Sequence, residues 1–254
     1  MWPPSPIPTH PDYPSITAEY ITCPPHLPPT PSFTLNYPYT PFIILSNVFT
    51  PSECTTFLSL ATVSTNGIWD AAGVNTGPSG AQRIYKDARD CGRIILHDEA
   101  LAKTILDRVR PWLEGREGQK RSGREEEWVG VIGAKGLNGV KWRITRFDPA
   151  LRFLRYVPGN YFRHHCDENK YHSATGELSF ITFHAYLNDV ESGGSTRVFA
   201  ESPDMNPDTE YIDIEAKMGS VMMFQQRGVR HSGEEVKVGC KYSIRTDVLY
   251  ERLL

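Results

Sequence analysis

Two residues near the middle of the chain have the types and the spacing of metal ligands. His165 and Asp167 are separated by one residue, and side chains two positions apart in a β-strand point to the same face. They can therefore bind one ion through an imidazole nitrogen and a carboxylate oxygen. His231, on a later stretch of the chain, is the candidate third ligand. Two histidines and one carboxylate with three open coordination positions are typical of non-haem Fe(II) sites.

The residues around this pair fit a strand that is entered through a tight turn. Pro158-Gly159 precedes the strand and favours such a turn, and Phe162 offers an apolar anchor within it. His231 is followed by Ser232-Gly233, and then by the segment from Gly239 to Asp247. These surroundings make the His-x-Asp pair more specific than the spacing alone.

The sequence here resembles the prolyl 4-hydroxylase-like 2-oxoglutarate/Fe(II) dioxygenases. The shared pattern runs from about Phe42 to Tyr250, and its specific part lies between Tyr156 and Asp247. It consists of three blocks, which are Tyr156-x-x-Gly159-x-x-Phe162-x-x-His165-x-Asp167, then Tyr186-Leu187-Asn188 with Gly193-Gly194-Ser195-Thr196, and then His231 with Lys241.

The resemblance implies a role for each matching residue. It assigns the iron to His165, Asp167 and His231. It assigns the distal carboxylate of 2-oxoglutarate to Lys241, which forms with Ser243 the Lys-x-Ser pair usual at that anchor. Tyr156 and Thr182 are implied as hydroxyl donors to the same co-substrate. The implied cofactors are Fe(II), 2-oxoglutarate and O2, with ascorbate as reductant.

The implied activity is hydroxylation of an unactivated C–H bond, with release of succinate and CO2. The substrate is either a peptidyl residue, such as proline, or a small molecule, because fold and metal site do not choose between them. The alternative is a catalytically silent jelly-roll module that binds a partner through a proline-rich docking arm. The complete ligand set and the Lys-x-Ser pair argue against this alternative.

Several other residues near the site have competing interpretations. Arg245 lies four residues after Lys241 with the same strand parity, so it is a rival anchor for the carboxylate; we expect it instead to pair with an acid such as Asp247 or Glu251. His164 should face away from His165, and His184 should belong to the core or to the substrate pocket. Zinc bound by His165, Cys166 and His231 is disfavoured, because adjacent strand side chains do not converge.

The elements that must position these residues are a few helices followed by many short strands. Thr50-Pro51 with Glu53 predicts the start of a helix, and Asp98 predicts the cap of a second one. Alternating segments after residue 150 predict strands. We therefore expect an α+β protein, and the resemblance specifies a double-stranded β-helix (jelly-roll, cupin-like) core with supporting N-terminal helices.

The chain divides into two parts by composition. Thirteen of its 20 prolines lie in the first 41 of 254 residues, which predicts a proline-rich arm over 1–40. Residues 41–254 would form one dioxygenase domain, with helical support over about 50–114 and the jelly-roll core over about 150–254. The region 136–149 is extra material compared with compact members of the family.

The overall composition bounds the partners and the compartment. A net charge of −3 gives no general attraction to phosphate backbones, so nucleic acid is not favoured as a partner. The five cysteines form no Cys-x-x-Cys pair, which suits a reducing compartment. No signal peptide or membrane-spanning stretch is recognisable, which predicts a cytoplasmic or nuclear protein. The sequence does not predict the oligomeric state.

Overall fold

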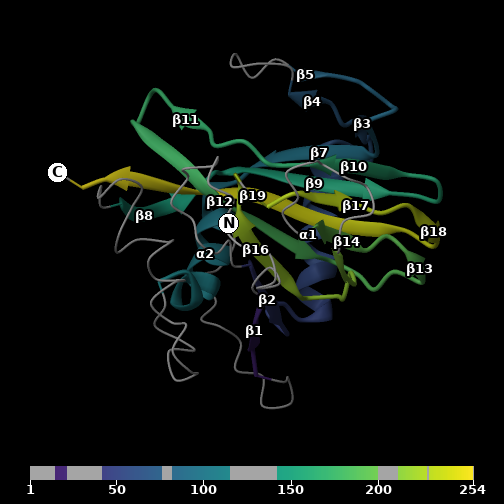
Figure 1. Ribbon diagram of the computed structural model, residues 1–254, viewed down its shortest axis with the longest axis horizontal. Helices are drawn as coiled ribbons and strands as arrows, with labels where there is room; N and C mark the ends of the chain where they lie inside the picture. The colour runs from purple at the N-terminus through teal and green to yellow at the C-terminus, as the bar shows by residue number, and fades with distance from the viewer. Residues whose placement is uncertain are drawn as a thin grey trace, which may run out of the picture.

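The computed structural model describes residues 15–21, 42–75, 82–114, 142–199, 211–227 and 229–253 (Figure 1). Half of these residues lie in antiparallel strands, which form a ten-stranded sheet, a five-stranded sheet and two small two-stranded sheets. The described helices are α1 (Pro51–Ser64) and α2 (Glu99–Leu113).

The large sheet contains ten strands in the spatial order β1-β2-β16-β12-β19-β9-β7-β3, with β11 beside β12 and β8 beside β19. Their bounds are β1 (Thr17–Ile21), β2 (Phe42–Ser46), β3 (Asp70–Ala71), β7 (Gly92–His97), β8 (Trp142–Phe147), β9 (Ala150–Tyr156), β11 (Tyr171–His172), β12 (Glu177–Tyr186), β16 (Val221–Gln225) and β19 (Lys241–Arg252).

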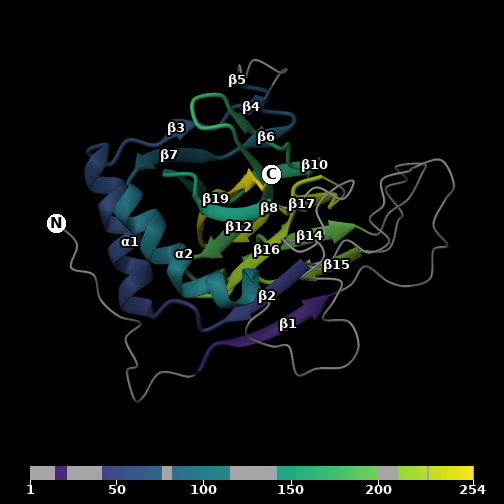
Figure 2. The same cartoon turned by 90° about the vertical axis from the view of Figure 1, so that its left-hand side faces the viewer.

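The second sheet has the order β15-β14-β17-β10-β6. Its strands are β6 (Arg89–Asp90), β10 (Tyr161–His165), β14 (Thr196–Phe199), β15 (Tyr211–Ile214) and β17 (His231–Gly233). The small pairs are β4 (Val74–Asn75) with β5 (Gln82–Arg83), and β13 (Ser192–Gly193) with β18 (Val236–Val238). Figure 2 shows the helices on one side of the large sheet and β14, β15 and β17 on the other.

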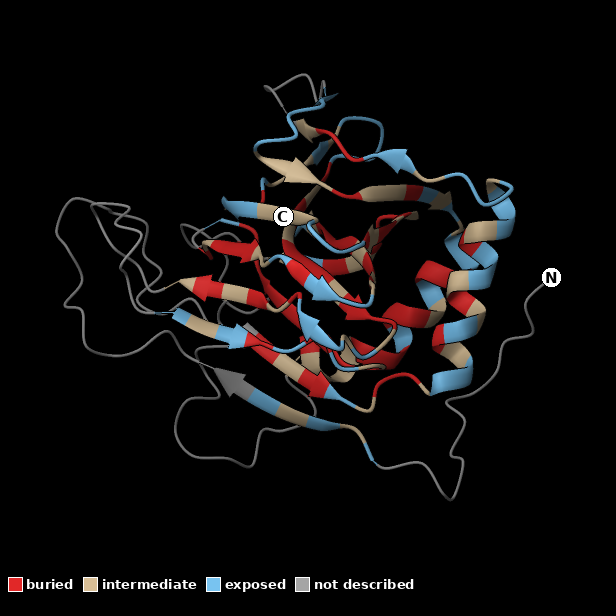
Figure 3. Cartoon of the chain, turned by 90° about the vertical axis from the view of Figure 1, so that its right-hand side faces the viewer, coloured by how far each residue is buried: buried red, intermediate tan, exposed pale blue. Residues whose placement is uncertain are grey.

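Strand alternation in the large sheet gives it two different faces. Along β12, Ile181 and Phe183 are buried in the cluster shared with both helices. Thr182 and Tyr186, of opposite parity, are also fully buried, and Tyr186 packs in the separate cluster toward the second sheet. Figure 3 shows this buried layer running between the helices and the sheets.

The helices begin where the sequence predicts. Thr50 and Glu53 form a reciprocal capping box, and the Asp98 carboxylate accepts from the backbone N–H of Leu101. The Arg108 guanidinium on α2 donates to Glu53 on α1 at 2.9 Å and to the carbonyl of Val48. Arg108 thus links the two helices that cover the large sheet.

The predicted fold class is confirmed, and the structure adds strands that the sequence did not predict. Part of the extra material, residues 142–147, is strand β8, which pairs with β19. The segment that follows Asp167 carries β11, which pairs with β12. Between the two helices the chain also forms β3 and β4.

Some predicted segments lie outside the described residues. These are most of the 1–40 arm and residues 136–141 of the extra material. Residues 17–21 of the predicted arm form strand β1 in the large sheet. In the part of the chain described, neither helix combines the length and the apolar character required to cross a bilayer.

Candidate metal site

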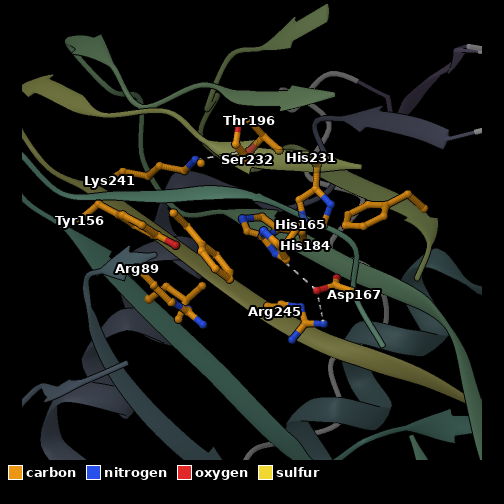
Figure 4. A pocket seen from close by; sticks show the side chains of 14 residues that line it. Arg89, Tyr156, His165, Asp167, His184, Thr196, His231, Ser232, Lys241 and Arg245 are labelled. Atoms are coloured by element: carbon orange, nitrogen blue, oxygen red, sulfur yellow. Dashed lines mark hydrogen bonds and ion pairs between the residues drawn. The ribbon is translucent and has the colours of Figure 1, made fainter. Parts of the chain in front are cut away.

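A pocket opens between the two sheets, and most of the predicted site residues lie around it (Figure 4). Its empty volume is about 480 Å³, which includes the part that is open to solvent. The residues that line it are Arg89, Leu154, Tyr156, Phe162, His165, Asp167, His184, Thr196, Phe224, His231, Ser232, Gly233, Lys241 and Arg245.

The three predicted metal ligands come together at this pocket. His165, the last residue of β10, pairs across the sheet with His231, the first residue of β17. The centroids of their rings lie 4.3 Å apart. One ligand atom from each of His165, Asp167 and His231 lies within 4.8 Å of the others. The strands thus bring residues that are far apart in sequence to one point.

Both imidazoles are oriented by backbone carbonyls. His165 Nδ1 lies 2.8 Å from the carbonyl oxygen of Arg163, and His231 Nδ1 lies 3.0 Å from that of Val229. Because a carbonyl only accepts, each Nδ1 carries the proton and each Nε2 keeps its lone pair for a metal. Burial, and then the neighbouring His231, lower the pKa of His165 to about 3. Burial also lowers the pKa of His231, so both rings are neutral at pH 7.

Asp167 is held on both of its oxygens. Arg245 Nη2 lies 2.9 Å from Oδ1, and the Thr182 hydroxyl donates to Oδ2 at 2.6 Å. Burial alone would raise the pKa of Asp167, but the Arg245 charge, together with His231, His165 and the Thr182 hydroxyl, outweighs it and holds that pKa far below its ordinary value. The carboxylate is therefore ionised and fixed in place.

Thr182 was expected to donate to 2-oxoglutarate. Its hydroxyl instead donates to Asp167, and Thr182 is not among the residues that line the pocket. Any contact of Thr182 with the co-substrate stays a prediction.

Arg245 belongs to a network of buried charges centred on Asp247. Besides Asp167, it approaches Asp247 at 3.5 Å. Asp247 is fully buried and also accepts from Lys170 Nζ at 2.8 Å and from Gln226 Nε2 at 2.9 Å. The expected pairing of Arg245 with Asp247 is thus present, whereas Glu251 pairs with Arg143.

The amine of Lys241 is buried without a carboxylate partner among the described residues. It donates to the carbonyl of Gly194 at 2.7 Å and lies 3.4 Å from the Thr196 hydroxyl. The rings of Tyr156 and Tyr186 lie 5.6 Å and 5.3 Å away. Burial lowers the pKa of this amine to about 8. A buried cation of this kind favours an incoming anion.

Gly194 explains why the Gly-Gly-x-Thr block precedes this lysine. Its φ is +69°, a backbone conformation that favours glycine. A Cβ at this position would lie 3.1 Å from the Val236 side chain and 3.6 Å from Lys241 Cδ. The motif thus lets the backbone approach the Lys241 side chain closely enough for its carbonyl to accept from the amine.

The hydroxyls predicted near the co-substrate are buried around Lys241. Tyr156 lines the pocket, and its pKa is raised by burial and then by the nearby Cys91, so it stays a neutral phenol. Ser243 is fully buried, does not line the pocket, and its hydroxyl has no partner among the described residues. The Tyr186 hydroxyl donates to the Thr196 hydroxyl at 2.7 Å. The sequence motif that contains Tyr186 did not predict this contact.

Two pocket residues were missed or left undecided by the sequence. Arg89 comes from β6, a two-residue strand with no recognisable pattern. His184 was expected in the core or in the substrate pocket, and it lines the pocket. Its buried Nε2 has no partner among the described residues. For His184 the strand parity shared with Thr182 was the available signal; for Arg89 there was none.

The residues expected to stay out of the site do so. His164 is exposed and its ring contacts that of Phe199. Cys166 is not part of the metal-ligating cluster found among the described residues. The disfavoured zinc arrangement therefore has no geometric support.

The donor set fits an iron ion with a dicarboxylate beside it. The neutral Nε2 atoms and the ionised carboxylate are the ligand types of a two-histidine, one-carboxylate site. The buried Lys241 amine lines the pocket and has no acid partner among the described residues, so it is a donor that a carboxylate group would satisfy.

Comparison with known proteins supports the same family. Residues 151–246 match the sequence profile of the 2OG-Fe(II) oxygenase superfamily. No curated protein matches the sequence significantly. Among solved structures, a Trichoplax adhaerens prolyl hydroxylase bound to a hypoxia inducible factor oxygen degradation domain peptide is 14% identical, with a TM-score of 0.53 and coverage of 82% of each chain.

A Pseudomonas putida prolyl-4-hydroxylase is 15% identical, with a TM-score of 0.51, over 82% of this chain and 91% of its own. At these identities the likeness concerns the fold. The profile match spans every predicted site residue, and the sheets have the arrangement of the jelly-roll oxygenases. Residues 151–246 therefore carry the sequence profile of the 2OG-Fe(II) oxygenase superfamily, on a fold that the chain shares with prolyl hydroxylases.

Proposed function

We propose that the protein is a prolyl 4-hydroxylase-like dioxygenase that hydroxylates an unactivated C–H bond of a peptidyl residue, such as proline, or of a small molecule. In the balanced reaction, one atom of O2 enters the substrate as a hydroxyl and the other enters succinate, while CO2 leaves. Bound Fe(II) and 2-oxoglutarate would supply this oxidative chemistry. Ascorbate would serve as the reductant that keeps the iron ferrous.

One observation carries this proposal. The His165–Asp167–His231 cluster lines the same pocket as the Lys241 amine, which has no acid partner among the described residues. Neither the metal cluster nor the buried lysine alone would define a function. Together they match a metal ion with a chelating acid whose far end needs a cation.

Each residue then has a defined task. His165, Asp167 and His231 would hold the iron, and Lys241 with Ser243 and Tyr156 would bind the co-substrate. Thr182 would act as a positioning residue, because its hydroxyl orients the Asp167 carboxylate.

The first experiment is the anaerobic addition of Fe(II) and 2-oxoglutarate to the full chain. We expect a weak visible charge-transfer band, which Asp167→Ala should abolish. Mass spectrometry of a native extract incubated with the protein, Fe(II), ascorbate and 2-oxoglutarate should then reveal a product heavier by one oxygen atom. The Asp167→Ala protein is the control for that product.

The silent binding module predicts a different result. It would form no band and would produce no succinate in air with any substrate pool. That outcome would remove the enzyme proposal while leaving the fold intact.

A further inference from the structure

Arg89 on β6 is a second cation that lines the pocket and has no acid partner among the described residues. The sequence did not predict this strand. The Arg89 guanidinium lies over the Phe162 ring, 4.4 Å from its centroid, and its Nε donates to Cys91 Sγ at 3.2 Å. No ion pair joins Arg89 to a carboxylate of the described residues, although eleven other arginine and lysine side chains there have such partners. A partly buried guanidinium without an acid favours an anionic ligand.

Arg89 stands close to the candidate metal ligands. The Phe162 ring that carries it is itself stacked on the His165 ring, with centroids 3.7 Å apart and planes at 25°. One aromatic ring therefore separates the guanidinium from a candidate ligand of the metal. Arg89 also lines the same pocket as the three candidate ligands, where a substrate must lie.

The charges of the loaded pocket leave Arg89 uncompensated. The two positive charges of Fe(II) would cancel the two negative charges of 2-oxoglutarate. The charged side chains of the lining are then the cations Lys241, Arg245 and Arg89 and the acid Asp167, which contacts Arg245. Asp247 lies outside the lining and is shared by Arg245, Arg152 and Lys170. The lining therefore keeps more cations than acids.

Arg245 offers a second donor toward the same region. Its Nε is buried and has no partner among the described residues, while its Nη2 already contacts Asp167. Figure 4 shows Lys241 above Tyr156, Arg89 below Tyr156, and Arg245 beside Asp167. Lys241 and Arg89 are therefore placed apart and can each meet a different anionic group.

We propose that the substrate carries a free carboxylate that binds the Arg89 guanidinium, with Arg245 Nε–H as a second donor. This deepens the proposed function and rests on it. The substrate class is then a small carboxylic acid, such as a free amino acid, rather than a residue in the interior of a peptide. A planar fork of donors suits a carboxylate, which explains an arginine at this position.

The test measures binding directly, so that it does not depend on finding the true substrate. The full chain is loaded anaerobically with Mn(II) and 2-oxoglutarate and titrated by calorimetry with each common free L-amino acid and with the corresponding amide. We expect at least one acid to bind at least tenfold more tightly than its amide. Arg89→Gln should remove that difference, and Arg89→Lys should keep part of it.

Arg155→Gln is the matched control. Its guanidinium also lies over an aromatic ring, 5.0 Å from the Trp69 centroid, and has no ion pair with a described acid, but it does not line the pocket. This variant should keep the preference for the acid. Arg89→Lys replaces Arg89→Gln if the glutamine protein does not fold.

The outcomes separate the two proposals. If the Fe(II)–2-oxoglutarate band fails to form in the unaltered protein, the proposed function is wrong. If the band forms but acids bind no better than amides, or no acid binds, the carboxylate proposal is overturned. It is also overturned if Arg89→Gln weakens only 2-oxoglutarate.

Discussion

The Lys241 amine is the residue on which co-substrate binding most depends. Its surroundings are a carbonyl, a hydroxyl and two aromatic rings, which stabilise a charge less than a carboxylate does. Breaking a buried ion pair costs about 3–5 kcal/mol, and each 1.4 kcal/mol is tenfold in affinity. We expect Lys241→Met to weaken 2-oxoglutarate binding by about 100-fold or more.

Titration of the charge-transfer band measures this effect. Ser243→Ala, which removes only a neutral hydroxyl, should weaken binding far less. Unchanged binding in Lys241→Met would move the anchor elsewhere, and Arg245 would be the first candidate.

The same amine should make co-substrate binding depend on pH. Its pKa is lowered by burial to about 8, and only the protonated form pairs with a carboxylate. Affinity for 2-oxoglutarate should therefore be constant below about pH 8 and fall about tenfold per pH unit above it. Lys241→Arg remains charged throughout and should show a flat profile to about pH 10. An equal decline in both proteins would exclude the amine as the titrating group.

The metal ligands could be predicted because one strand carries two of them at a spacing that fixes their faces. Arg245 could not be assigned in the same way. Its parity with Lys241 was visible, but its contact with Asp167 depends on how the chain after β10 passes over β19. Arg89 was missed because it reaches the site by pairing with β10 and not through any local pattern.

At the scale of elements, the segment after β10 is fixed to β19 by two ion pairs. Asp167 contacts Arg245, and Lys170, three residues later, contacts the buried Asp247. The Lys170 backbone N–H donates to the Ser179 hydroxyl on β12, and the Ser179 backbone N–H donates to the Lys170 carbonyl. This arrangement holds the Asp167 carboxylate in place before any metal arrives.

Asp247→Asn should therefore destabilise the protein strongly. The change leaves Arg245, Arg152 and Lys170 without their shared buried acid, and such losses cost about 3–5 kcal/mol. Chemical denaturation measures the free energy of unfolding. The control is Asp213→Asn, which breaks the half-exposed pair with Arg197 and should cost about 1 kcal/mol or less. Equal costs would show that the Asp247 network does not stabilise the fold.

The long strands and both helices were predictable because their own residues define them. β12 is a long and largely buried segment, and α1 and α2 begin at recognisable caps. The short strands β3, β6 and β11 were not, because two residues carry no period. These strands form because their backbones pair with β7, β10 and β12.

Across the whole molecule, the site joins the two sheets. His165 and His231 belong to the second sheet, whereas Lys241 and Tyr156 belong to the large one. A metal ion with its co-substrate would bridge them, and ligands that bind only the folded state stabilise it by about 2.7 kcal/mol at 100 times their Kd. We expect Mn(II) plus 2-oxoglutarate to raise the unfolding temperature by several degrees in a thermal melt.

His231→Ala is the control for this stabilisation. Its unfolding temperature should not respond to Mn(II), because one of the three ligands is missing. A similar increase in both proteins would mean that the ion binds elsewhere.

Strand β1 has a consequence beyond the site. It pairs along its full length with β2, from Thr17 against Ser46 to Ile21 against Phe42, and so occupies what would otherwise be a bare row of peptide groups. Such open borders recruit other chains and promote aggregation. A protein shortened to begin after Ile21 should consequently self-associate through Phe42–Ser46, which sedimentation velocity would register as larger species than those of the full chain.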